Sequence, residues 1–593
     1  MKDFLKIMLA TMAGMLLFSV VWIMLLFSFI GSVAALSSDT PVVPEEGVLY
    51  MDMSNFVIAE KENPMDVSSL MQANLKVKTL SLLSAIQALN IAAEDPGIKY
   101  IYMRPDGVSA GIADIEELRK AILKFRESGK AVISFVENPS NASYYLASAA
   151  DKVYVTASKG GMNMVLGLSS QMFFLKDLLD KLGVNMQLIR HGKYKSAGEM
   201  YIKNRISKEN YEQTHAMISS IWNSWVSDIA ASRNISPEDF NALLDNLSLV
   251  EPEDFVEAGL ADAQLGREDR KQKLCDLYMV EDFNDVQFIP FEDYTIARTS
   301  APVFGTNQIA VIYADGEIVD GSDDPQNVAG DTFAEMIAQV RANDMVKAVV
   351  LRVNSPGGSV LASDKIRREL QLLRESKPVV ASYGNYAASG GYWISAESDY
   401  IFSDATTLTG SIGVFSLIPD FGKAVKDLAH INVTNVNSNR HSDMYFSMRP
   451  LDEDETAYAQ KSVENIYEEF TSIVADGRGL RKTYVDSIAQ GRVWAGADAL
   501  KIGLVDEIGG LEDALNMAAF KADGSTSYQN FHIARYPAPQ TPLESILAAF
   551  QGTNTPLVFA GTPFEAVERA FAPLKCTDTG KIYARLPYEY IIQ

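Results

Sequence analysis

The chain has 593 residues, and at roughly 150 residues per domain this length predicts two to four domains. Apolar residues make up 47% of the chain, enough to build hydrophobic cores, whereas the formal net charge of −24 argues against a nucleic-acid partner. The two cysteines, Cys275 and Cys576, lie far apart, and the five scattered histidines form no HExxH motif, so a disulfide framework and a cysteine-based zinc cluster are excluded.

The N-terminus carries a long uncharged segment, residues 7–36. About 20 apolar residues span a bilayer, so this segment is long enough to cross with some tilt. Lys2 and Lys6 precede it, which places the short N-terminus in the cytoplasm and the rest of the chain outside. A cleaved signal peptide is the alternative, but its apolar region is usually only about 7–15 residues long. We therefore predict that residues 1–40 form a cytoplasmic stub and a single transmembrane anchor.

The rest of the chain contains an internal duplication. Three pairs of segments match at an offset of 248, 248 and 244 positions: residues 100–104 (YIYMR) with 348–352 (AVVLR), 144–151 (YYLASAAD) with 392–399 (YWISAESD), and 258–262 (AGLAD) with 502–506 (IGLVD). A period of about 250 residues is too long for a solenoid repeat. We predict two similar domains, residues 41–300 and 301–540, followed by a C-terminal tail, residues 541–593.

Each half alternates short apolar runs with helical patterns. Residues 348–353 and 379–382 are short, apolar and β-branched, as buried strands are. Residues 363–375, between them, have apolar side chains three and four positions apart, which is the spacing of an amphipathic helix. Residues 207–231 and 451–475 are expected to form long surface helices. This alternation predicts an α/β fold in both halves.

A Gly-Gly turn, in residues 354–359 (NSPGGS), follows one of these strands. Such a turn allows positive φ and leaves N–H groups free to point at an anion, as in an oxyanion hole. The first half has Ser109-Ala110 at the equivalent place. An ordinary strand-to-helix loop is the alternative, and the absence of GxxxxGK[ST] disfavours phosphate binding.

A second motif, residues 385–391 (NYAASGG), is expected at the start of a tightly packed helix. Ser389 in this motif would lie where backbone N–H groups and the helix dipole stabilise negative charge. Its counterpart in the first half is Asn141, which cannot act as a nucleophile. Ser389 is therefore either a nucleophile or a helix cap, because serine is also a preferred capping residue.

As a nucleophile, Ser389 would need a general base to remove its hydroxyl proton. A Ser-His-Asp triad needs a histidine within reach, and none of the five lies in an equivalent loop with a recognisable carboxylate partner. Lys195, within residues 192–197 (GKYKSA), is a candidate, and Asp443 replaces it in the second half. A lysine can serve as the base if burial lowers its pKa from about 10.4 to about 7–8, which costs about 4 kcal/mol. A solvated surface lysine is the ordinary alternative.

With the YKSA motif at residues 194–197 and the AASGGY motif at residues 387–392, essentially the whole chain resembles the long form of the signal peptide peptidase A (protease IV) family. The resemblance implies tandem ClpP/crotonase-like domains built from repeated ββα units. It implies a dyad in which Ser389 is the nucleophile and Lys195, from the first domain, is the general base. Ser411, within residues 409–413 (TGSIG), would orient the lysine amine. Gly358 and Gly390 would supply the oxyanion N–H groups.

The resemblance also implies a membrane-anchored serine endopeptidase that degrades released signal peptides. The expected partners are apolar peptides, the lipid bilayer through residues 7–36, and further copies of the chain in a bowl-shaped homo-oligomer, a tetramer in the family. The expected location is the bacterial inner membrane, with the catalytic domains on the periplasmic side. No cofactor or metal is expected. A non-catalytic membrane scaffold and a crotonase-type acyl-CoA enzyme are the alternatives; the anchor argues against the latter.

Overall fold

A computed structural model describes residues 41–61, 77–299, 307–322, 327–538 and 581–586, together with residues 6, 8, 11, 12, 14–22 and 24. Residues 14–22 are helical. Among the described residues, no helix combines the length and the hydropathy needed to cross a bilayer. Residues 25–36 of the predicted span 7–36 lie outside the described part of the chain, as does the predicted tail apart from residues 581–586.

The first half is built on a parallel sheet with the strand order β8-β6-β5-β4-β1-β9. Its strands are β1 (Gly47–Asp52), β4 (Ile98–Arg104), β5 (Val132–Val136), β6 (Lys152–Thr156), β8 (Ala263–Leu265) and β9 (Phe288–Pro290). A separate parallel pair joins β2 (Phe56–Ala59) and β3 (Lys78–Ser81). The helices are α3 (Leu82–Glu94), α4 (Ile112–Arg126), α5 (Asn141–Ala147), α6 (Lys176–Leu182), α7 (Glu199–Ile202), α8 (Lys208–Arg233), α9 (Pro237–Asp245), α10 (Pro252–Glu257), α11 (Arg267–Tyr278) and α12 (Phe291–Thr299).

The second half has a corresponding sheet, in which β20, β16, β15, β13, β10 and β21 follow one another through parallel pairs. These strands are β10 (Gln308–Asp315), β13 (Val346–Ser355), β15 (Val379–Ala388), β16 (Tyr400–Ser403), β20 (Glu507–Ile508) and β21 (His532–Tyr536). Two further strands, β17 (Leu408–Gly410) and β19 (Val493–Ala495), extend the sheet beyond the end of β15. The predicted α/β class is confirmed in both halves, and their matching strand order agrees with the predicted duplication.

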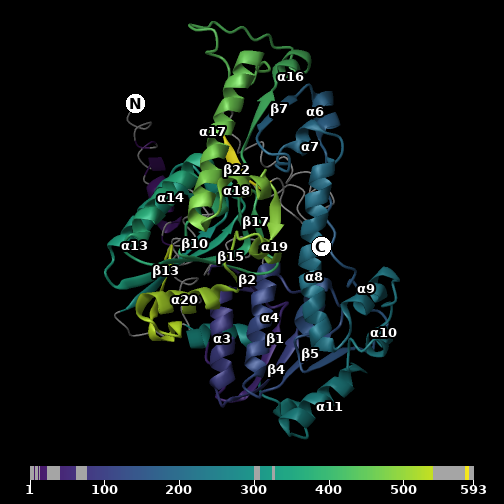
Figure 1. The fold of residues 1–593 in the computed structure, drawn as a ribbon. Helices are drawn as coiled ribbons and strands as arrows, with labels where there is room; N and C mark the ends of the chain where they lie inside the picture. The colour runs from purple at the N-terminus through teal and green to yellow at the C-terminus, as the bar shows by residue number, and fades with distance from the viewer. Residues whose placement is uncertain are drawn as a thin grey trace.

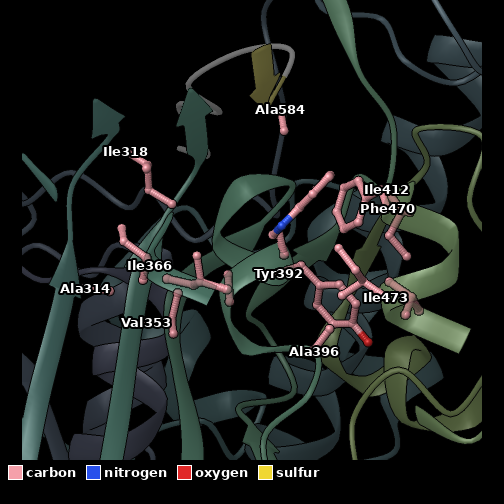
Figure 2. Packing of buried hydrophobic residues seen from close by; sticks show 14 of the residues in the cluster. Ala314, Ile318, Val353, Ile366, Tyr392, Ala396, Ile412, Phe470, Ile473 and Ala584 are labelled. Atoms are coloured by element: carbon pink, nitrogen blue, oxygen red, sulfur yellow. The ribbon is translucent and has the colours of Figure 1, made fainter. Parts of the chain in front are cut away.

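The helices of the second half are α13 (Gly330–Ala342), α14 (Val360–Arg374), α15 (Gly390–Ser395), α16 (Gly422–Asp427), α17 (Glu453–Arg478), α18 (Lys482–Ile488), α19 (Gly496–Lys501) and α20 (Leu511–Asp523). The short helix α15 is central to the core of this half. Figure 2 shows Tyr392 and Ala396 beside Ile412, Phe470 and Ile473, all members of one buried cluster. Helix α15 is thereby held between its own sheet and α17, which fixes the position of the residues just before it.

A third sheet, with the order β12-β11-β14-β22-β18-β7, combines both halves and the tail. Its strands are β7 (Asn185–Arg190), β11 (Ile318–Val319), β12 (Val328–Ala329), β14 (Gly357–Ser359), β18 (Phe415–Asp420) and β22 (Tyr583–Arg585). First-half strand β7 runs antiparallel to second-half strand β18 over six residue pairs. In Figure 1, β7, α6 and α7 accordingly lie beside α16 and α17, away from β1, β4 and β5. The first half thus reaches across the second half at this sheet.

A buried group of charges also joins the two halves. The Arg352 guanidinium on β13 lies 2.8 Å from a Glu60 carboxylate oxygen, 2.8 Å from Glu117 and 3.7 Å from Asp114. All four side chains are at most 4% exposed, and the three acids come from the first half. Burial raises the pKa of the Glu60 and Asp114 carboxyl groups. Because removing one partner leaves the others buried without compensation, this group fixes the relative position of the halves.

Candidate active site

Ser389 lies at the junction between strand β15 and helix α15. The first four residues of the predicted helix-start motif belong to the strand, and the helix begins at Gly390. Ser389 has φ 56° and ψ −109°, a conformation that L-residues rarely adopt, and its side chain makes no capping hydrogen bond to α15. Its N–H donates to the Gly410 carbonyl at 2.8 Å. A sharp strand-to-helix turn therefore holds a fully buried hydroxyl that the helix does not use, and such strain is common at active sites.

Lys195 meets Ser389 inside the protein, although 194 residues separate them in the chain. The Lys195 Nζ atom lies 2.9 Å from Ser389 Oγ, 3.0 Å from Ser411 Oγ and 3.2 Å from the Ser411 carbonyl oxygen. A neutral amine has two N–H groups and one lone pair. The two N–H groups can donate to the oxygens of Ser411, which leaves the lone pair free to accept a proton from the Ser389 hydroxyl.

The surroundings of Lys195 favour that neutral form. Its side chain has no exposed surface, and burial lowers the pKa of the amine well below its usual value. The ring of Phe415 lies 6.0 Å from Nζ. A desolvated ammonium is costly, so burial shifts the equilibrium toward the free amine, which is the form a general base requires.

Ser411 follows β17 and has a positive φ of 50°. Its N–H donates to the Arg492 carbonyl at 2.7 Å, and the N–H of Gly491 donates to Ile412 at 2.8 Å. These two hydrogen bonds fasten the turn after β17 to the segment that leads into β19. The turn thereby presents both oxygens of Ser411 to the lysine amine.

Gln213 on α8 holds the loop that carries Lys195, and sequence reasoning missed it. Its buried amide Nε2 donates to the Tyr194 carbonyl and to Ser196 Oγ, each at 3.0 Å. Its Oε1 accepts from the N–H of Val493 at 3.2 Å. One side chain therefore links the residues on both sides of Lys195 to strand β19 of the other half. Position 213 reads as an ordinary helical glutamine, so no sequence pattern could have identified it.

Gly491 forms the wall behind Lys195, and this position was also missed. Its φ is +77°, and a β-carbon built on it would lie 2.5 Å from Lys195 Cβ and 2.6 Å from Lys195 Cα. The neighbouring N–H of Tyr194 donates to the Gln490 carbonyl at 2.9 Å. The lysine loop can therefore pack this closely only against a glycine.

The two glycines of the predicted Gly-Gly turn belong to the short strand β14, and this Gly-Gly segment faces the start of helix α15. Gly357 has φ +95°, and a β-carbon built on it would stand 2.6 Å from the N atom of Gly390. One built on Gly358 would stand 1.9 Å from the Ile318 carbonyl oxygen. The turn lies beside the first N–H groups of α15, which have no partner inside the helix. Gly358 and Gly390 were predicted to form an oxyanion hole; the contribution of Gly357 to its shape was not.

The equivalent positions of the duplicated halves have structural contacts instead. Asn141, the counterpart of Ser389, accepts hydrogen bonds from the N–H groups of Leu166 and Gly167, both at 3.1 Å. Asp443, the counterpart of Lys195, forms an ion pair with Arg449 at 2.8 Å. Within the described residues, the reactive hydroxyl and amine therefore come together once, with one contributed by each half.

Known proteins share sequence with both halves of the chain. The model of the family described as "Peptidase family S49" matches residues 124–281 and 371–524, one region in each half. The chain is 33% identical over 522 residues to "Protease 4" of Haemophilus influenzae, covering 85% of this chain and 84% of that protein. It is 34% identical to "Protease 4" of Salmonella typhi, covering 86% and 83%. It is 32% identical to "Serine protease SPPA, chloroplastic" of Arabidopsis thaliana, covering 77% and 68%.

Proposed function

The chain belongs to peptidase family S49 and is a serine protease, and from this premise we propose that Ser389 and Lys195 form its catalytic dyad. The observation that carries the proposal is the 2.9 Å contact between Lys195 Nζ and Ser389 Oγ, two fully buried groups. A weak nucleophile is activated by an adjacent base, and a desolvated lysine can act as that base. Ser411 orients the amine through its two oxygens.

The proposed reaction proceeds through an acyl-enzyme. Neutral Lys195 accepts the hydroxyl proton as Ser389 Oγ attacks the peptide carbonyl carbon. The N–H groups of Gly358 and Gly390 hold the resulting oxyanion. Lys195 then gives the proton to the leaving amine as the C–N bond breaks, and a water molecule hydrolyses the ester to release Ser389. Oxyanion donors of this kind typically contribute about 10²- to 10³-fold to the rate.

Apolar peptides, and released signal peptides in particular, are the proposed substrates. The similarity to relatives named Protease 4 and SPPA supports this class. The residues near the serine support it as well, because Ala388, Leu408 and Val493 belong to one apolar cluster. A single-pass anchor in the bacterial inner membrane, a periplasmic location and a tetrameric assembly complete the proposal; all three rest on the family resemblance and on the uncharged segment 7–36.

The decisive experiment compares three variants of the full chain on a fluorogenic apolar peptide. Ser389→Ala and Lys195→Met should each lower kcat/KM by about 10³-fold or more, because members of a dyad act as a unit. Lys193→Met is the matched control, since Lys193 is exposed and lies two positions away; it should keep full activity. A Lys195→Met protein that stays folded and active would remove the dyad. A synthetic signal peptide should be cut faster than a polar peptide of equal length, and equal rates would remove the proposed substrate class.

A further inference from the structure

Strand β22, from the C-terminal tail, lies against the Gly-Gly turn of the candidate active site. It runs antiparallel to β14 and pairs Arg585 with Gly357, Ala584 with Gly358 and Tyr583 with Ser359. At the ends of the strand, Leu586 N–H donates to Pro356 at 2.8 Å, and Val360 N–H donates to Ile582 at 3.5 Å. The other edge of β22 meets β18 through Tyr583 and Phe415. The tail thus fills the gap between β14 and β18 in the sheet that both halves share.

A carbonyl group of this strand points at the proposed oxyanion hole. The Ala584 carbonyl oxygen would lie 2.1 Å from a β-carbon built on Gly357 and 3.0 Å from one built on Gly390. It therefore stands between the Gly-Gly turn and the start of α15, where the proposed reaction requires the carbonyl of a peptide substrate. Figure 2 shows Ala584 projecting from β22 toward the packed core beneath it.

The side chains of the tail occupy sites that suit a peptide. Ala584 is fully buried, and Leu586, two positions later on the same face of an extended chain, is 4% exposed. Leu586 belongs to an apolar cluster with Ala388, the residue that precedes Ser389, and with Met217 and Ile221 of α8. A site for a small side chain thus adjoins a pocket for an apolar one, and both halves line the pocket.

Ion pairs at the two ends of the strand fix its register. Lys581 Nζ lies 2.9 Å from Asp320, and Arg585 lies 3.1 Å from Glu317. Ser416 Oγ also donates to the Lys581 carbonyl at 2.9 Å. A shift of one residue would break both ion pairs and turn Leu586 out of its pocket.

We propose that residues 581–586 occupy the substrate groove of their own active site, and that a peptide substrate binds by replacing this strand. The substrate would pair with β14 as an added strand, a common mode of peptide recognition. It would place a small side chain at the Ala584 position and an apolar side chain in the Leu586 pocket. The inference rests on the proposed function and adds the binding mode, the two side-chain sites and an internal competitor.

The first test displaces residues 581–586 from the substrate groove. Leu586→Asp places a charge in the apolar pocket, whereas Leu500→Asp, at an exposed leucine of α19, is the matched control. If the tail occupies the groove in about nine-tenths of the molecules, only about one-tenth can bind substrate, and KM is about tenfold higher. Leu586→Asp should therefore lower KM for the fluorogenic apolar peptide by about that factor and speed labelling of Ser389 by a small fluorophosphonate probe. Unchanged KM and labelling in both variants would overturn the proposal.

The second test locks the tail in place. Ser359 and Tyr583 stand directly opposite each other across the antiparallel pair, which is a separation that a disulfide can bridge. In a Cys576→Ser background, the oxidised Ser359→Cys, Tyr583→Cys protein should lose peptide hydrolysis and probe labelling, and a reductant should restore both. Full activity of the oxidised form, with the disulfide verified by mass spectrometry, would overturn the inference. An active Ser389→Ala variant would instead overturn the proposed function itself.

Discussion

Gly491 offers the sharpest test of the geometry around Lys195. In Gly491→Ala the new β-carbon would lie 2.5–2.6 Å from Lys195 Cβ, Cα and N, and two of these three are backbone atoms. Backbone atoms cannot rotate away, so restoring ordinary van der Waals contact requires the lysine loop to move by about 1 Å. A misplacement of about 1 Å can cost about 10²-fold in rate, which corresponds to about 2.7 kcal/mol. The positive φ adds a stability cost of about 1–2 kcal/mol.

Gly479 provides the control, because it has φ +63° and nothing lies within 4 Å of a β-carbon built on it. Gly479→Ala should show the same conformational cost of about 1–2 kcal/mol in thermal or denaturant unfolding, with unchanged kcat/KM. Gly491→Ala should lose at least as much stability and, in addition, about 10²-fold in kcat/KM for the apolar peptide. A folded Gly491→Ala protein that retained control-level kcat/KM would refute the packing of Lys195 described above.

Further predictions concern Lys195, Gln213 and Arg352. Because burial lowers the pKa of Lys195, kcat/KM in a pH series should rise to a plateau above that lowered pKa, and a flat profile would contradict a lysine base. An unfolded lysine keeps its proton up to about pH 10.4, so between the lowered pKa and that value the unfolding free energy of the parent should rise with pH relative to Lys195→Met. Gln213→Ala removes two hydrogen bonds to the neighbours of Lys195 and one from Val493. It should cost about 1–3 kcal/mol of stability and about tenfold in kcat/KM, whereas a stability loss with full activity would limit Gln213 to a structural role. Arg352→Met leaves three buried carboxyl groups without their shared cation and should lower stability by about 3–5 kcal/mol. Burial raises the pKa of Glu60 and the charge of Arg352 opposes that rise, so the variant should have a still higher Glu60 pKa. The stability loss measured by denaturant titration should therefore grow as pH rises above the parent's raised Glu60 pKa, and a pH-independent loss would argue against this charge group.

Local patterns predicted several individual elements of secondary structure. The helices expected at residues 207–231 and 451–475 are α8 and α17, each within three residues at both ends. Both depend on apolar spacing along a single segment, which the sequence displays directly. The α/β class followed for the same reason. The third sheet was not predicted, because its strands come from both halves and from the tail, and no local pattern specifies such distant pairing.

The site residues divide in the same way. Ser389 and Lys195 stood out because the duplicated halves differ at these positions. Whether Ser389 caps its helix depends on its backbone conformation. Whether Lys195 is shielded from solvent depends on neighbours that come from both halves. Neither property is visible in a motif. Gln213 and Gly491 were not predicted for the same reason. Each acts only through contact with the Lys195 loop, and that contact is not visible in the sequence.

The division of the proposed dyad between two halves would tie the chemistry to the completion of folding. While the second half is still unfolded, Lys195 is hydrated and therefore charged, and Ser389 has no proton acceptor within reach. Only when β7 has joined β18 and the lysine loop has closed against Gly491 does the amine become dry enough to release its proton. Under the proposed mechanism, a nascent or half-denatured chain therefore has no activated serine with which to cleave its neighbours.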